Sequence, residues 1–285
     1  MKGGDSLELR VLNRREDFIE LYLSGVPLYI VNSIRRTIIS EVPSMAISTV
    51  IFTLNRSMFY DEYVAHRLGL IPLTSEAALN KYKSPEECSE SEEASLFPPD
   101  CFVKLDLDVS NNDGDLRTIY SRDLKSSDPE VRPVYDDIPV LMLGEGHQVK
   151  LEAYARLGRG KEHYKWSPVS AAAIKYVPEI SIDRSRCYSG CRKCIEVCPR
   201  NVFKVTNVGV EVNEASVLNC NLCHLCEKVC PSEAITLKTR ENEYILRIES
   251  TGSLSLKRIL LESIKILSGK VSELSKKLEI QGVLK

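Results

Sequence analysis

Eight of the ten cysteines of this chain lie in two short runs between Cys187 and Pro231. The first run is Cys187-x3-Cys191-x2-Cys194-x3-Cys198-Pro199, and the second is Cys220-x2-Cys223-x2-Cys226-x3-Cys230-Pro231. Cys191, Cys194 and Cys198 recur at one constant offset as Cys223, Cys226 and Cys230. The first cysteines of the two runs, Cys187 and Cys220, are separated by one residue more than the other pairs, because the first run carries one extra residue in its first gap. The repeat predicts two similar halves whose thiols serve the same kind of centre.

The second run has the cysteine spacing of bacterial ferredoxins, in which thiolates hold iron–sulfur clusters. Three thiolates two residues apart let one tight loop cover three corners of a cluster, and the fourth thiolate reaches the other cluster. The spacing therefore predicts crossed pairing in a small ferredoxin-like unit. Cluster B takes Cys220, Cys223 and Cys226 from the second run and Cys198 from the first. Cluster A takes Cys187, Cys191, Cys194 and Cys230.

Two other uses of the cysteines stay open from the spacing. Zinc also binds pairs of cysteines two residues apart, but it explains neither the third cysteine of each run nor the two Cys-Pro endings. Disulfides are the other alternative, and they are rare in a chain without an export signal. The number and type of clusters also stay open: one or two [4Fe-4S] clusters, or one [3Fe-4S] cluster held by Cys220, Cys223 and Cys226.

The composition of the whole chain narrows the class of protein. Its 285 residues suffice for two or three domains. The N-terminal residues form no apolar signal segment, and no run approaches the roughly 18 apolar residues of a membrane span. We therefore expect a cytoplasmic protein. The formal charge is −2, with 38 Lys and Arg against 40 Asp and Glu, which argues against direct nucleic-acid binding.

The segments outside the cysteine-rich region predict an α+β host. Residues 7–11 alternate as a strand does, residues 18–23 are also expected to form a strand, and Pro27 opens a helix expected to end near Ser40. Further strands are expected over 46–54, 171–177 and 244–249. A long helix is expected from Gly252 to Leu278.

The apolar residues of this last helix recur at steps of three and four, as in the seam of a coiled coil. The seam consists of Leu256, Leu260, Ile264, Leu267, Val271, Leu274 and Leu278. The pattern alone leaves open whether the seam packs on the chain's own sheet or binds a second chain.

A β-rich segment is expected between the two host parts. Residues 75–101 predict a loop, because an acidic run is followed by Phe97-Pro98-Pro99. Cys88 and Cys101 are too few for a zinc site, so we expect no metal there, and their role stays open. Strands are expected over 102–109, 116–120, 138–143 and 149–155, and the first two read as a hairpin around the turn at 111–114.

No residue of the chain carries a pattern that predicts catalysis. Residues 158–161, Gly-Arg-Gly-Lys, lack the spacing of a phosphate-binding loop. His66 has no nucleophile and acid arranged around it in the sequence, so a structural role is favoured. Asp106 and Asp108 lie on an alternating strand, where an exposed face is a better explanation than a Mg²⁺ site.

Three motifs show a resemblance to a known family. The stretch from Val31 to Pro43, VNSIRRTIISEVP, resembles the signature helix of alpha-type subunits of multisubunit RNA polymerases. The stretch from Tyr60 to Leu73, YDEYVAHRLGLIPL, and the stretch from Leu157 to Trp166, LGRGKEHYKW, are similar to later blocks of that family. Together with the cysteine-rich insert, the resemblance is specifically to the archaeal alpha-type subunits of DNA-directed RNA polymerase.

This resemblance implies a non-catalytic assembly subunit and names its partners. It implies a heterodimer with the small subunit L through the terminal helices, including Leu260, Ile264, Leu267, Val271 and Leu274. It also implies docking of the small subunits N and P and of the second-largest subunit, with Arg35 and Arg36 on the helix that faces a large subunit. The eukaryotic counterparts carry a zinc loop near Cys88 and Cys101, and this chain departs from that pattern.

We therefore expect an α+β fold with two insertions into one host. The dimerisation domain comprises 1–48, 170–180 and 242–285, the β-rich insert 49–169, and the ferredoxin-like domain 181–241. An electron-transfer subunit of an oxidoreductase is the main alternative, although the chain has no dinucleotide fingerprint. A zinc-stabilised interaction module is the second alternative. We expect the clusters to act structurally, and the sequence leaves a sensory role open.

Overall fold

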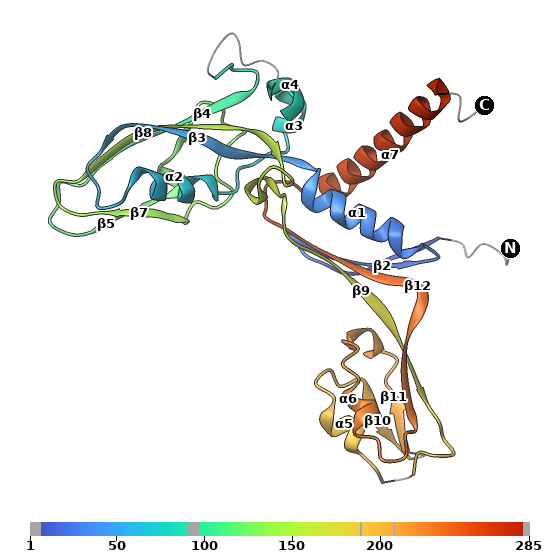
Figure 1. Ribbon diagram of the computed structural model, residues 1–285. Coiled ribbons are helices and arrows are strands. Elements are labelled where there is room, and N and C mark those ends of the chain that lie inside the picture. Colours follow the sequence, from blue (N-terminus) through green and yellow to red (C-terminus); the bar gives the residue numbers. More distant parts are fainter. Residues whose placement is uncertain (1–6, 90–96, 189, 208, 282–285) are drawn as a thin grey trace. The chain divides into compact units, whose positions relative to one another are not determined.

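The computed structural model describes residues 7–89, 97–188, 190–207 and 209–281. The chain divides into two compact units, each of which gathers segments that are distant in the sequence (Figure 1). Unit 1 comprises Met1–Leu12, Leu21–Leu28 and Ile174–Leu246, and unit 2 comprises Asn13–Glu20, Tyr29–Ala173 and Arg247–Lys285. Both units contain helices and antiparallel strands, which confirms the predicted mixture of α and β structure.

Unit 2 is built on an antiparallel sheet in the order β3-β8-β4-β6. These strands are β3 (Pro43–Asn55), β4 (Phe102–Ser110), β6 (Lys125–Ser126) and β8 (Gln148–Arg159). On β4 the odd-numbered residues from Val103 to Val109 are buried, as strand alternation requires. Helix α2 (Asp61–Gly69) adds Val64 and Leu68 to the same core. Burying one aliphatic side chain of this size stabilises the fold by about 2 kcal/mol.

The predicted hairpin after β4 is wrong. Strand β5 (Arg117–Tyr120) pairs with β7 (Pro139–Leu143) in a separate two-stranded sheet, whereas β4 pairs with β8 and β6. The buried side chain of Asn111 explains the difference. Its amide donates hydrogen bonds to the backbone carbonyls of Asp115 and Leu143, so the chain leaving β4 is tied to β7.

The expectation of a plain loop over 75–101 is also wrong in part. The segment contains two short helices, α3 (Ala78–Lys81) and α4 (Pro85–Ser89). Ser84 and Glu87 form a capping box at α4: the carboxylate accepts from the Ser84 backbone N–H at 2.8 Å, and the Ser84 hydroxyl accepts from the Glu87 N–H. This Ser-x-x-Glu signal was available in the sequence.

Cys88, at the end of α4, is joined by a disulfide to Cys101, which is buried just before β4. Closing a loop of this length contributes about 3 kcal/mol to stability.

We therefore expect Cys88→Ser to lower the unfolding midpoint of the insert by an amount that corresponds to this energy. A reductant should reproduce the loss in the natural chain and leave the variant unchanged. If the natural chain were equally stable with and without reductant, the bond would contribute nothing.

Helices α1 (Leu28–Ser40) and α7 (Leu256–Ile280) belong to unit 2 almost entirely. Helix α1 buries Val31 and Ile38, and β3 begins directly after it at Pro43. Helix α7 begins later than predicted, because the hydroxyl of Ser255 caps it by accepting from the Arg258 N–H at 3.2 Å. Glycine at 252 instead occupies a left-handed turn with φ +85°.

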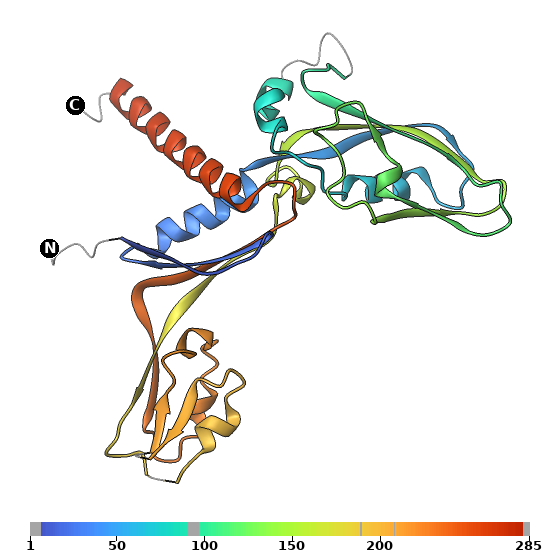
Figure 2. The same ribbon diagram turned by 180° about the vertical axis from the view of Figure 1, so that it is seen from behind.

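Unit 1 contains most of two long strands and the cysteine-rich lobe between them (Figure 2). The long strands are β9 (Val169–Ile182) and β12 (Ile235–Ser250), in a sheet of order β1-β2-β12-β9 with β1 (Glu8–Arg14) and β2 (Phe18–Ser24). The lobe contains α5 (Lys193–Val197), β10 (Phe203–Thr206), β11 (Gly209–Val212) and α6 (Leu225–Lys228). Short 3-10 turns lie at Ser121–Asp123 and Tyr164–Trp166 in unit 2 and at Val217–Asn219 in unit 1.

Candidate metal centre

The repeat of the cysteine runs extends to the backbone of the lobe. Helix α5 begins at Lys193 and α6 begins at Leu225, the same offset that relates Cys194 to Cys226. Strand β10 begins at Phe203 and β12 begins at Ile235, again at this offset. Each half is therefore a cysteine loop, a short helix, a Cys-Pro segment and a strand. The same residue spacing produces the same local structure twice.

Left-handed residues recur at the same offset. Gly190 and Leu222 have φ values of +98° and +56°, and Asn201 and Glu233 have values of 51° and 50°. Such a conformation is uncommon for residues other than glycine and costs of order 1 kcal/mol or more. At Leu222 it accompanies a backbone N–H that donates to the Cys220 sulfur at 3.4 Å. The loops therefore adopt unfavourable turns that direct backbone donors to sulfur.

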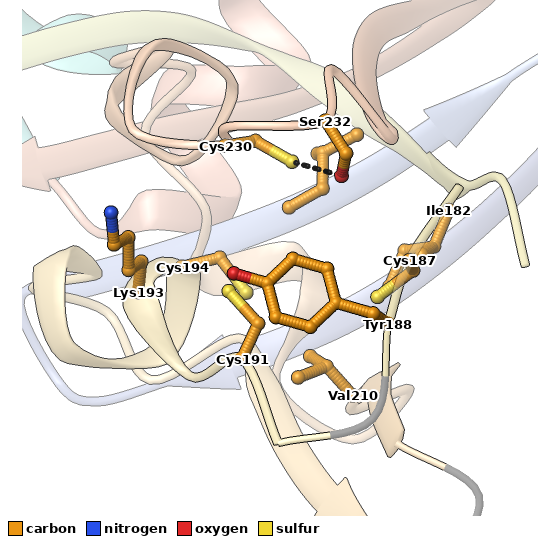
Figure 3. Close-up of a pocket in the computed structure, with 10 residues that line it drawn as sticks. Ile182, Cys187, Tyr188, Cys191, Lys193, Cys194, Val210, Cys230 and Ser232 are labelled. Atoms are coloured by element: carbon orange, nitrogen blue, oxygen red, sulfur yellow. Dashed lines mark hydrogen bonds between the residues drawn. The ribbon is translucent and has the colours of Figure 1, made fainter.

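One pocket of the lobe is lined by the four thiols assigned to cluster A, Cys187, Cys191, Cys194 and Cys230. Figure 3 shows the Cys230 sulfur facing those of the first run, with the ring of Tyr188 lying among them. About 360 Å³ of space between atoms lies at this pocket, part of it open to solvent. Three of the four thiols come from the first run and the fourth comes from the second, as the predicted crossed pairing requires.

The four thiols assigned to cluster B lie near one another in the same lobe. Cys220 and Cys226 are buried in it with Cys198 packed against them, and Cys223 is exposed. Burial, and then the neighbouring thiols of Cys198 and Cys223, raise the pKa of Cys220. Cys198 from the first run thus lies with cysteines of the second.

Burial raises the pKa of three thiols of the lobe, those of Cys194, Cys220 and Cys226. It raises the pKa of Cys226 to about 11. Burial also tends to raise the pKa of the Cys230 thiol. Hydrogen bonds from the Ala234 N–H at 3.2 Å and from Ser232 outweigh this effect, so the pKa of Cys230 is lowered. Metal binding would have to displace protons from the buried thiols.

The residues present fit iron–sulfur clusters. Each site offers four thiols, and backbone N–H groups donate to a sulfur in both sites, at Cys220 and at Cys230. Four thiolates are the usual ligand set of a [4Fe-4S] cluster, and N–H donors to sulfur tune such clusters. Within the described parts of the chain, no group of three or more His, Cys, Asp or Glu side chains is placed to hold a single metal ion.

The other predicted site residues lie in unit 2. Arg36 is exposed on α1, and Arg35 is half-buried with its Nε donating to Asn32 at 3.0 Å. On α7, Leu260 and Leu267 are half-buried, whereas Ile264, Val271 and Leu274 are 52%, 67% and 58% exposed. Asp106 and Asp108 pair with Lys104 and Lys150 at 3.0 Å, and His66 is exposed on α2.

A junction at Glu41 was not visible in the sequence. The Glu41 carboxylate, just after α1, lies 2.9 Å from the ammonium of Lys270 on α7 and 3.3 Å from that of Lys161. Arg159 donates to the Glu41 backbone carbonyl at 2.8 Å and to the Glu86 carboxylate at 3.0 Å. The Gly-Arg-Gly-Lys stretch is thus where α1, α4, α7 and β8 meet. Its pattern gave no signal of partners so distant in the sequence.

Comparisons with known proteins agree with this architecture. The family model described as the RNA polymerase Rpb3/RpoA insert domain matches residues 45–185. Three relatives carry the name DNA-directed RNA polymerase subunit Rpo3. That of Aeropyrum pernix is 37% identical over 269 residues, covering 93% of each chain. Those of Archaeoglobus fulgidus and Methanosphaera stadtmanae are 38% and 35% identical, covering 95% and 94% of this chain and 98% and 97% of theirs.

A chain of mixed α and β structure with an Rpb3/RpoA insert domain is an alpha-type RNA polymerase subunit. Because the sequence identity to these relatives extends over nearly the whole length of the chain, the chain belongs to the family of archaeal DNA-directed RNA polymerase subunit Rpo3. The predicted family resemblance is confirmed. In the described part of the chain, no helix is long and apolar enough to span a membrane.

Proposed function

We propose that this chain is a non-catalytic assembly subunit of an archaeal DNA-directed RNA polymerase and that its lobe holds iron–sulfur clusters. Family membership supports the first part, because relatives matching along nearly their full length are named as polymerase subunits. It favours a role within the nucleotidyltransferase complex over the alternative of an electron-transfer subunit. The chain would act in the cytoplasm without binding nucleic acid directly.

The observation that carries the assembly role is the exposed seam of α7. The first turns of the helix are buried at Leu256 and Ile259, but beyond Ser263 the apolar residues Ile264, Val271 and Leu274 are exposed. A seam at coiled-coil spacing gains stability when a second helix covers it. This exposure supports the interpretation in which the seam binds another chain, and the small subunit L is the proposed partner.

The remaining partners follow from the same family. We assign α1, with the exposed Arg36 and the neighbouring Arg35, to the contact with the second-largest subunit. The small subunits N and P would dock on the heterodimer. A planar guanidinium suits such a contact because it presents several donors to carboxylates or backbone carbonyls.

The cofactor proposal rests on the two groups of four thiols. Cys187, Cys191, Cys194 and Cys230 would hold cluster A, and Cys198, Cys220, Cys223 and Cys226 would hold cluster B. When bound, the clusters would cross-link the two halves of the repeat, which supports a structural role. The burial of Cys194, Cys220 and Cys226 in one apolar core supports this role, because their bonds to iron would form inside the folding core. Zinc in place of iron is the alternative that iron and sulfide analysis tests.

An α7 variant tests the assembly role. We expect Leu274→Asp to weaken binding of subunit L about 30-fold, which corresponds to about 2 kcal/mol, because a carboxylate would be buried in the seam. Ser272→Asp, on the opposite side of the helix, is the matched control and should bind normally. Affinity is measured by titrating the purified chain with subunit L. Normal binding by Leu274→Asp would overturn the seam as the contact, and co-purification of the native chain with a flavoprotein would overturn the polymerase role.

A further inference from the structure

Glu227 connects the cysteine loop of cluster B to a long strand. It lies on α6, and its Oε1 accepts a hydrogen bond from the backbone N–H of Leu237 on β12 at 2.5 Å. Its Oε2 contacts Nδ1 of His224. Hydrogen bonds to a carboxylate are roughly twice as strong as those between neutral groups. One side chain therefore ties the loop to β12.

The position of Glu227 makes this tie specific to the metal loop. Glu227 directly follows Cys226, and its backbone N–H faces the Cys226 sulfur. His224 directly follows Cys223 and has the left-handed φ of 59°. The carboxylate thus holds both ends of the turn that carries Cys223 and Cys226. Cys223 is exposed, so this turn is the part of site B most open to solvent.

The other half of the repeat provides an internal comparison. The residue equivalent to Glu227 in the first half is Ile195, which packs against the apolar core of the lobe. The equivalent of His224 is Arg192, and the equivalent of Leu237 is the exposed Val205. The first half therefore replaces the carboxylate with an apolar contact, although its backbone is equivalent.

We propose that Glu227 is a positioning residue for cluster B, which keeps Cys223 and Cys226 at the spacing that the cluster requires. This inference rests on the proposed iron–sulfur cofactor. Without the carboxylate, the turn carrying the exposed Cys223 loosens and iron leaves site B first. Site A has no equivalent tie among the described residues and is unaffected. Residues that orient metal ligands are worth about 10–100-fold in metal affinity.

The test measures cluster lifetime in the full chain. The protein is reconstituted anaerobically with iron and sulfide, and the decay of visible absorbance is followed after exposure to air. Samples reduced with dithionite give the electron paramagnetic resonance signature of the cluster that remains. Cys230→Ser and Cys198→Ser backgrounds isolate clusters B and A. We expect Glu227→Ala to shorten the lifetime of cluster B about tenfold and to alter its resonance signature. Glu227→Gln keeps an oxygen acceptor for the Leu237 N–H and should restore most of the lifetime.

Glu196→Ala, on the exposed surface of α5, is the matched control and should leave both lifetimes unchanged. If Glu227→Ala shortened the lifetimes of both clusters equally, Glu227 would have a general role in folding and the positioning role would be wrong. Equal lifetimes of cluster B in Glu227→Ala and the natural chain would overturn the positioning role while leaving the cofactor intact. A natural chain that takes up no iron would overturn both.

Discussion

Replacing Cys198 with serine is expected to abolish cluster B, although Cys198 lies in the run that supplies most of cluster A. The reason is the crossed arrangement, in which Cys198 packs with Cys220 and Cys226 and raises the pKa of both after the larger effect of burial. Cys230→Ser is expected to abolish cluster A instead, because Cys230 lines the pocket of Cys187, Cys191 and Cys194. Each variant should lose about half of the iron and keep the other cluster.

The two variants are natural controls for each other. Iron and sulfide per chain give the number of clusters, and the resonance signatures distinguish which cluster remains. Cys223→Ser should give the same remaining signature as Cys198→Ser, because both belong to site B. If Cys198→Ser instead matched Cys194→Ser, each run would hold its own cluster and the crossed pairing would be wrong.

Replacing Gly160 with alanine is expected to lower the free energy of unfolding of unit 2 by about 3 kcal/mol. A Cβ atom at this position would lie 2.0 Å from the backbone carbonyl oxygen of Ile39 and 3.3 Å from Cα of Ser40. The end of α1 would have to move away from β8, because the contacting atoms belong to the backbone and cannot relieve the clash by a change of rotamer. The Lys161 N–H, which donates to the Ser40 carbonyl at 3.0 Å, would lose its partner.

Chemical denaturation followed by circular dichroism measures this change. Gly269→Ala is the matched control, because a Cβ at Gly269 in α7 would meet nothing within 4 Å. That substitution is expected to raise stability by about 1 kcal/mol, since alanine favours helix. If Gly160→Ala were as stable as the natural chain, α1 and β8 would not be in the close contact described. A displaced α1 would also weaken binding of the second-largest subunit under the proposed function.

Sequence patterns that repeat every few residues predicted many of the strands and helices. The alternation over 102–109 and 149–155 identified β4 and β8, and the helix predicted from Pro27 to Ser40 begins one residue later and ends where expected. The seam pattern identified α7, and the Cys-x2-Cys spacing selected the thiols that the lobe brings together. These features are visible because each depends on neighbours within a few residues along the chain.

Features that depend on distant partners were missed. The hairpin prediction failed because buried Asn111 bonds to the carbonyl of Leu143, far beyond the expected turn. The two glycines of the Gly-Arg-Gly-Lys stretch are explained by the tertiary structure, in which Gly160 lies against the backbone carbonyl of Ile39 and Gly158 lies against the ring of Trp166. No local pattern distinguishes a glycine in a flexible loop from one that permits close approach of two elements.

By itself the sequence determined the spacing of the two cysteine runs, the repeat that relates them, the mixture of α and β structure and the family to which the chain belongs. Only the tertiary structure decided that Cys230 faces Cys187, Cys191 and Cys194, that α7 leaves its seam exposed, and that Glu41 joins α1 to α7. Spacing restricts what a short loop can reach. Contacts between segments that are distant along the chain depend instead on how the sheets pack.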